Sequence, residues 1–282
     1  MGETDGQNLS AGAAAGPAFA FDLSQPINLA EIDRQVTARR TRTTANAAGA
    51  TALPCPLLIS GLSDEAARQL QGPFQALGIL AVPGPGGATA AADGDTSLKP
   101  GGTLAIPLVT GDIRMSAVGT VTEVRGNRIY GFGHSLFGGG PTNLPMASGK
   151  VYTVVSNLVS SFKLATCADI VGAITCDQSG AVVGQVGAQP RMVPLTIRCE
   201  RFNALEPCEY RCQVAYHPEL TPSLARAAIF TAAYRGGAFP ATHTVEYDAT
   251  IDLSDGRSIH FTNTAANTEL AEPGIEMAGT LS

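Results

Sequence analysis

The clearest pattern of apolar and polar positions lies in segment 243–253 of the 282-residue chain. Most of its odd-numbered positions are apolar or aromatic, whereas every even-numbered position is Thr, Glu or Asp. Because successive side chains of a strand point to opposite faces, this alternation predicts a strand with one wet face. Asp255-Gly256 is a turn dipeptide, so 258–262 is expected to pair back as the second strand of a hairpin.

Shorter apolar runs bounded by turn residues predict further strands. Gly126-Asn127 favours a tight hairpin turn between two of them. For 151–155 the apolar positions also fit helical spacing, so a helix there is the alternative. The predicted strands are 57–60, 79–82, 103–109, 113–124, 128–132, 151–155, 193–199 and 210–216.

Helix signals occur at two places in the chain. Ser63 stands where an N-cap is expected, and Gly78 follows a helical stretch that reaches residue 77. Thr221-Pro222 combines an N-cap residue with proline at the first helical position, which predicts a helix that runs to about Ala232.

Composition supports a turn-rich, strand-rich chain. Only 15% of residues are charged and 44% are hydrophobic, with 32 Gly, 18 Pro and no Trp. The net charge of -6 leaves no basic face for nucleic acid, which excludes that class of partner. No apolar run is long enough to span a membrane, so we expect no membrane span.

These signals predict a mainly β fold in successive segments. A flexible lead-in precedes a strand–helix–strand unit and a Gly- and Pro-rich linker, and a β core precedes a β-rich module with one helix. Residues 1–16 carry no Lys or Arg and therefore lack the basic region of a secretory signal peptide. The expected segments are 1–50, 51–82, 83–102, 103–195 and 196–282, in that order.

The most informative candidate for chemistry is His134. It follows the predicted strand 128–132 and is flanked by Gly131, Gly133 and the run 138–140. Histidine titrates near neutral pH and is the usual general base for a serine or cysteine nucleophile. The alternative is a histidine at a strand end whose ring is satisfied by a backbone carbonyl.

Three blocks of the sequence, 117–138, 144–165 and 171–195, resemble the SpoIVB-type serine peptidase family in its divergent, non-sporulation branch. The first block contains the Gly133-His134 pair, and the third ends in GAQPRMVPL. The resemblance implies a chymotrypsin-like β-barrel core, with His134 as the catalytic histidine and a protein or peptide as substrate. It also implies export to the periplasm or cell envelope of a bacterium.

The nucleophile of that family does not carry over. Its serine lies in a G-M-S-G-S-P-type segment, which this chain lacks. The nearest imitation is Ser179, in the segment 177–181, only 45 residues after His134. Ser179 is therefore a weak candidate nucleophile, with a turn serine as the alternative, and Asp169 and Asp177 are candidate orienting acids.

Six cysteines permit two interpretations. In an oxidising compartment we expect disulfides among Cys199, Cys208 and Cys212, and between Cys167 and Cys176 across a turn. The other interpretation is a zinc knuckle formed by Cys199, Cys208, Cys212 and His217. Strand-like sequence around 210–216 disfavours zinc, so the sequence predicts neither a metal nor another cofactor.

Two function hypotheses follow. The first is a SpoIVB-like serine endopeptidase of the cell envelope with His134 as general base. The second is a catalytically inactive scaffold or interaction module that retains the peptidase fold. The missing serine motif favours the second hypothesis, and the glycine-flanked histidine favours the first.

Overall fold

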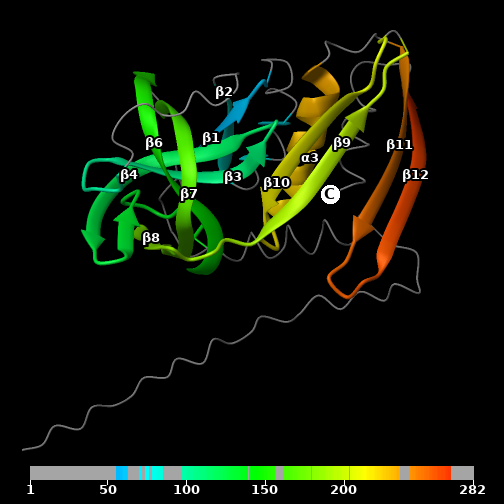
Figure 1. Ribbon diagram of the computed structural model, residues 1–282. Helices are drawn as coiled ribbons and strands as arrows, with labels where there is room; N and C mark the ends of the chain where they lie inside the picture. Colours follow the sequence, from blue (N-terminus) through cyan, green and yellow to red (C-terminus); the bar gives the residue numbers. More distant parts are fainter. Residues whose placement is uncertain are drawn as a thin grey trace, which may run out of the picture. The chain divides into compact units, whose positions relative to one another are not determined.

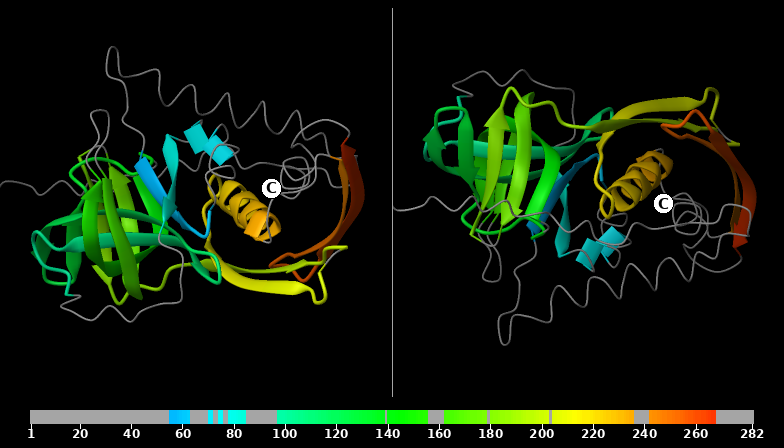
Figure 2. Two further views of the ribbon diagram at one scale, coloured as in Figure 1. Left: turned by 90° about the horizontal axis from the view of Figure 1, so that it is seen from above. Right: turned by 90° about the horizontal axis from the view of Figure 1, so that it is seen from below.

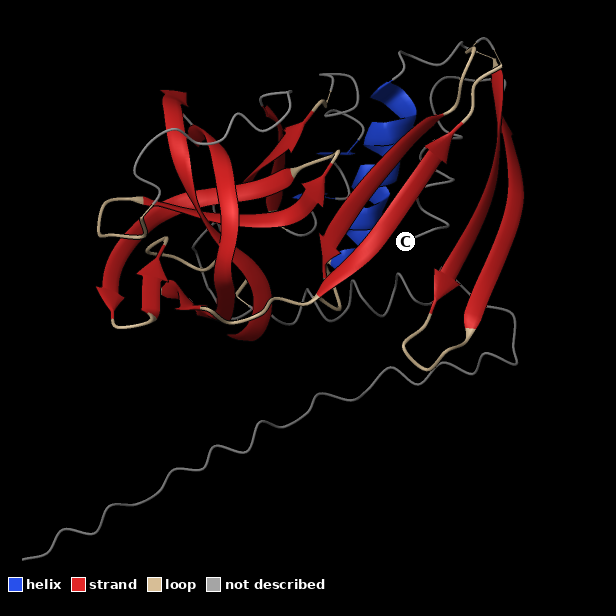
Figure 3. Ribbon diagram, in the orientation of Figure 1, coloured by secondary structure: helices blue, strands red, loops and turns tan. Residues whose placement is uncertain are grey.

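The computed structural model describes residues 55–62, 70–71, 74–75, 78–84, 97–138, 140–155, 162–178, 180–202, 204–235 and 242–267. The chain separates into two units, Met1–Ala48 and Gly49–Ser282, and all described residues belong to the second. This part of the protein is mainly β, as the sequence predicted (Figure 3). Its elements are β1 (Cys55–Ser60), β2 (Ile79–Gly84), β3 (Thr103–Gly111), β4 (Met115–Arg125), β5 (Arg128–Gly131), β6 (Gly140–Val155), β7 (Phe162–Gln178), β8 (Ala181–Val186), β9 (Met192–Cys199), β10 (Cys208–Ala215), α3 (Thr221–Arg235), β11 (His243–Asp252) and β12 (Ser258–Asn267).

Six of the strands close into an antiparallel barrel. Strands β3, β4 and β5 form one meander, and β6, β7 and β8 form a second. β5 pairs with β8 and β3 pairs with β6, so the two meanders join along both edges (Figure 1). The connection from β5 to β6 crosses from one meander to the other, and it carries His134.

The barrel interior is filled by aliphatic side chains and by Met146, and two glycines give that methionine its room. A Cβ atom at Gly184 would overlap Met146 Sδ, and one at Gly172 would approach Met146 Cε and overlap Gln185 O. Both glycines lie on β7 or β8 and face Met146 of β6. The small residues thus allow strands of the second meander to pack closely around one large side chain.

Strands β3 and β4 extend beyond the barrel into a second, open sheet. The first residues of β4, Met115–Ala117, pair with β1, and the last residues of β3, Val109–Gly111, pair with β10. Outside the barrel the strand order is therefore β2-β1-β4-β3-β10-β9. β1 and β2 run parallel, and the described residues between them at 70–71 and 74–75 are helical, in agreement with the predicted strand–helix–strand unit.

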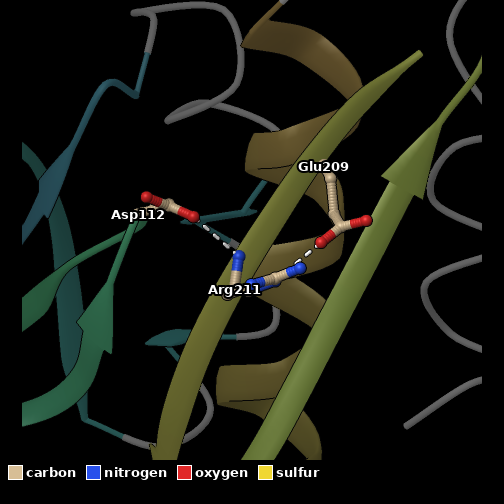
Figure 4. A network of polar contacts seen from close by, with 3 residues as sticks. All are labelled: Asp112, Glu209 and Arg211. Carbon is tan, nitrogen blue, oxygen red and sulfur yellow. Dashed lines mark hydrogen bonds and ion pairs between the residues drawn. The ribbon is translucent and has the colours of Figure 1, made fainter.

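The turn between β3 and β4 is held against β10 by polar contacts. The backbone N–H of Arg211 donates to Asp112 Oδ2 at 2.8 Å, and the N–H of Asp112 donates to Arg211 O at 3.0 Å. Arg235 of α3 adds a hydrogen bond from Nη1 to Asp112 O. Figure 4 shows Asp112 beside Arg211, whose guanidinium pairs with Glu209 on the same strand.

Helix α3 lies against strands β3, β9 and β10 (Figure 2). Residues Ala227–Ala232 are all buried. Six consecutive helical positions point in every direction around the axis, so the helix is covered on all sides there. Val245 and Tyr247 of β11 pack against the same core, which gives the β11–β12 hairpin its apolar face.

Most predicted strands are present, but the sequence patterns missed the length of β6 and the existence of β7 and β8. The pairing of β6 with β7 contains four register shifts, and β7 with β8 contains one. Each bulge puts two residues opposite one and so breaks the period-two alternation on which strand prediction depends. The 151–155 segment is strand rather than helix. The lead-in 1–50 and positions 85–96 of the linker lie outside the described residues.

Candidate functional site: the barrel end around His134 and Asp177

The loop 132–138 carries His134 at the end of the barrel. Phe132 begins it with φ of 68°, and its N–H donates to Thr120 O at 2.9 Å. Its ring occupies the space where a side chain at Gly119 would lie. The same ring meets the His134 ring edge-on, with ring centroids 5.6 Å apart. The glycine at 119 therefore seats Phe132, and Phe132 supports one side of the imidazole.

The His134 ring is exposed, and its hydrogen bond defines its tautomer. Nδ1 lies 2.6 Å from the carbonyl oxygen of Ser135, so Nδ1–H is the donor. In the neutral ring this leaves the lone pair on Nε2, the nitrogen a general base would use. Among the described residues nothing forms a hydrogen bond with Nε2. This contact is the one expected for the alternative role of His134, a histidine at a strand end whose ring is satisfied by a backbone carbonyl.

Asp177, at the end of β7, ties the His134 loop to the barrel. The residue is 3% exposed, and its carboxylate accepts hydrogen bonds from three backbone N–H groups, those of Leu136 at 2.8 Å, Phe137 at 2.6 Å and Gly138 at 2.8 Å. Consecutive N–H groups that converge on one carboxylate form an anion-binding nest. Here the anion is a side chain of the protein itself, so the nest fixes the loop.

The candidate acids and nucleophile are not assembled around His134 within the described residues. The hydrogen bonds of Asp177 go to the loop backbone and not to the imidazole. Asp169 is exposed on β7 and lines a cavity that does not include His134. Ser179 lies outside the described residues. Two features of the sequence signalled the nest: the glycine-rich loop around His134 and the aspartate at position 177.

Two further titratable side chains are within electrostatic reach of Asp177. Burial raises the pKa of the Cys55 thiol to about 12, with a smaller contribution from Asp177. Burial lowers the pKa of His217, although Glu219 and Asp177 oppose that shift. His217 Nδ1 accepts a hydrogen bond from the Glu219 N–H at 3.3 Å, so the neutral ring carries its proton on Nε2. Because burial raises the pKa of its thiol, Cys55 is a protonated core thiol and not a nucleophile.

We predict that His217 makes the protein less stable in mild acid. Its pKa in the folded state lies below the unfolded value, so the unfolded chain binds more protons as the pH falls below about 6.5. The free energy of unfolding should therefore decrease through that range in urea titrations of the wild-type protein. The free energy of unfolding of His217→Asn, which keeps an acceptor for the Glu219 N–H, should decrease less steeply as the pH falls. Equal slopes in the wild-type protein and the variant would contradict the assignment of this pH dependence to His217.

A cavity of about 340 Å³ lies between the open sheet and β7. Strands β1 to β4 supply one wall, including Ser116, together with Arg114 of the β3–β4 turn, and β7 supplies the other, including Cys167 and Asp169. Burial raises the pKa of the Cys167 thiol, while a hydrogen bond with Ser116 and the charge of Arg114 act in the opposite direction. The space is large enough for a side chain or small molecule, and its lining is mixed apolar and polar.

One of the predicted disulfides is wrong. Cys167 and Cys176 lie on the same continuous strand, β7, rather than across a turn. Nine residues of strand separate their Cα atoms by roughly 30 Å, and a disulfide requires less than about 7 Å. Cys212 is buried and directs its thiol to Ile113 O, whereas Cys199 and Cys208 face each other on neighbouring strands.

The described residues contain no cluster of three or more His, Cys, Asp or Glu that would suit a metal ion. In particular, Cys199, Cys208, Cys212 and His217 do not form one. Within the same residues no helix is both long and apolar enough to cross a membrane.

Comparison with known proteins adds no assignment, since no family model, curated protein or solved structure matches the chain.

Proposed function

We propose that this chain is a SpoIVB-peptidase-like barrel that acts in the bacterial cell envelope as a catalytically inactive interaction module. The sequence resemblance supports the family and the envelope location. The use of Asp177 supports the loss of catalysis. In a serine peptidase the acid orients the histidine and stabilises its charged form. Here the three hydrogen bonds of the carboxylate are made with the loop backbone.

Exposed apolar side chains support a binding role. Phe202 and Leu205 lie in the loop between β9 and β10, and both are as exposed as in an extended chain. Charged residues of both signs flank them along the chain, with Arg198 and Glu200 before the pair and Glu209 after it. An apolar tip with a mixed-charge rim is suited to a partner protein rather than to nucleic acid or an anionic lipid surface.

A serine-directed fluorophosphonate probe tests the proposal. We expect the native protein to show no labelling above that of the heat-denatured protein, and His134→Ala and Ser179→Ala to be indistinguishable from it. A known serine peptidase in the same reaction controls for probe quality. Labelling of the native protein that either variant abolishes would contradict the inactive module.

The second candidate is an active serine endopeptidase, and the geometry of His134 favours it. The ring is exposed, and its Nδ1–H contact leaves Nε2 available as a base toward solvent. Ser179, or a residue elsewhere outside the described part, would have to supply the hydroxyl. Labelling that is lost in both His134→Ala and Ser179→Ala would support this candidate and assign its nucleophile.

A further inference from the structure

The two cysteines at the ends of strands β9 and β10 are direct cross-strand neighbours. Cys199 is the last residue of β9 and Cys208 the first of β10, and the antiparallel register pairs them. Directly opposed residues have Cα atoms about 4.5 or 5.5 Å apart, and both values lie within the range of natural disulfides. Both thiols are free in this structure, and the spacing of the two strands is one that a disulfide can bridge.

We propose that Cys199 and Cys208 are a redox-active pair that forms a disulfide across the base of the β9–β10 loop. This inference does not depend on whether the barrel is catalytic. The register singles out this pair from the six cysteines of the chain. Cys212 is four residues along β10 and buried against Ile113 O, and Cys167 and Cys176 lie on the barrel strand β7.

The surroundings indicate the order of the reaction. Cys208 is exposed, whereas Cys199 is half-buried. Burial, followed by the neighbouring Cys208, raises the pKa of the Cys199 thiol, and Arg201 acts against that shift. Arg201 is held in place by a hydrogen bond from Nη2 to Ala233 O at the end of α3. The accessible Cys208 is therefore the first to react and Cys199 the second.

The oxidant is a small-molecule disulfide of the glutathione class. The Cys208 thiolate attacks one of its sulfurs, which forms a mixed disulfide and releases one glutathione thiol. The Cys199 thiolate then displaces the second glutathione, and the Cys199–Cys208 bond forms. In total the protein loses two protons and two electrons, which reduce one oxidised glutathione to two thiols.

The disulfide would close the loop that carries Phe202 and Leu205. A closed loop has fewer conformations available, so the two exposed side chains are held for a partner with less loss of entropy on binding. The anchored Arg201, next to Phe202, fixes the same loop from the side of α3. Oxidation thus stabilises the apolar tip rather than creating it.

Trypsin can separate the two cysteines, which makes the test direct. Cleavage after Arg198, Arg201 and Arg211 places Cys199 in peptide 199–201 and Cys208 in peptide 202–211. The folded protein is incubated with oxidised glutathione, blocked with iodoacetamide, digested and analysed by mass spectrometry. We expect the two peptides to be recovered as one disulfide-linked species that reductant separates.

Two variants serve as controls. Cys199→Ser should abolish the linked species and leave Cys208 as a stable mixed disulfide with glutathione. Cys176→Ser, which removes a cysteine of the barrel, should leave the yield of linked peptide unchanged. Recovery of both cysteines as separate glutathione adducts in the wild-type protein, or a link from either cysteine to Cys212, would overturn the proposal.

Discussion

Replacement of Asp177 by alanine is expected to lower the free energy of unfolding by about 3–5 kcal/mol, because three backbone N–H groups lose one charged acceptor together. The N–H groups of Leu136, Phe137 and Gly138 have this carboxylate as their partner, and Leu136 is itself in the core. Asp177→Asn should recover only part of the lost free energy of unfolding. Its amide oxygen can still accept a hydrogen bond, but its NH₂ group is a donor and would face the backbone N–H donors of the loop. Urea unfolding monitored by circular dichroism measures both variants.

Asp169→Ala is the matched control, because Asp169 lies on the same strand but is exposed. Its effect should stay within about 0.5 kcal/mol. Amide hydrogen exchange adds a local measurement: in Asp177→Ala, protection should fall first at 136–138. If Asp177→Ala were as stable as Asp169→Ala, the carboxylate would not anchor the loop, and an orienting role toward His134 would regain support.

Substitution of Gly111 by alanine should cost about 3 kcal/mol. Its φ is 107°, which is unfavourable for any residue with a Cβ atom, and that Cβ would overlap the carbonyl oxygen of Arg211. The overlap falls on the contact that joins the β3–β4 turn to β10, where Asp112 and Arg211 exchange hydrogen bonds (Figure 4). Chemical unfolding gives the free-energy difference.

Gly126→Ala separates the two contributions to this cost. Gly126 lies in the turn between β4 and β5 and, like Gly111, has a positive φ, of 58°, but a Cβ atom there would meet nothing within 4 Å. Its substitution should therefore cost only the backbone term, about 1 kcal/mol. Equal losses for Gly111→Ala and Gly126→Ala would show that β10 yields to the added methyl group without penalty.

The sequence was a good guide wherever the local pattern was regular. The alternation over 243–253 corresponds to β11, and Thr221-Pro222 begins α3, because side-chain periodicity and capping are local properties. It failed over β6 to β8, where bulges interrupt the alternation and where pairing joins residues distant along the chain. The error of pairing Cys167 with Cys176 has the same origin, because a turn was expected where β7 is continuous.

Candidate chemistry was predictable to a lesser extent. Of the glycines around His134, Gly131 lies at a close approach of the backbone, since a Cβ atom there would come within 2.9 Å of Thr120 O. A Cβ atom at Gly133 or Gly140 would meet nothing within 4 Å. The partner of the loop was not predictable, because the contact from Leu136 to Asp177 spans 41 positions. Aspartate at a strand end is equally compatible with an orienting acid and with an anchor. Only the direction of the N–H groups distinguishes these roles.

Strands β3 and β4 are shared by the closed barrel and the open sheet, and this has a consequence for how the protein unfolds. Neither sheet has its full set of hydrogen-bonded neighbours without these two strands. If the open sheet separated, the extended ends of β3 and β4 would become unprotected edges. We therefore expect the barrel and the open sheet to gain and lose their structure together, as one cooperative unit rather than as modules that fold in turn.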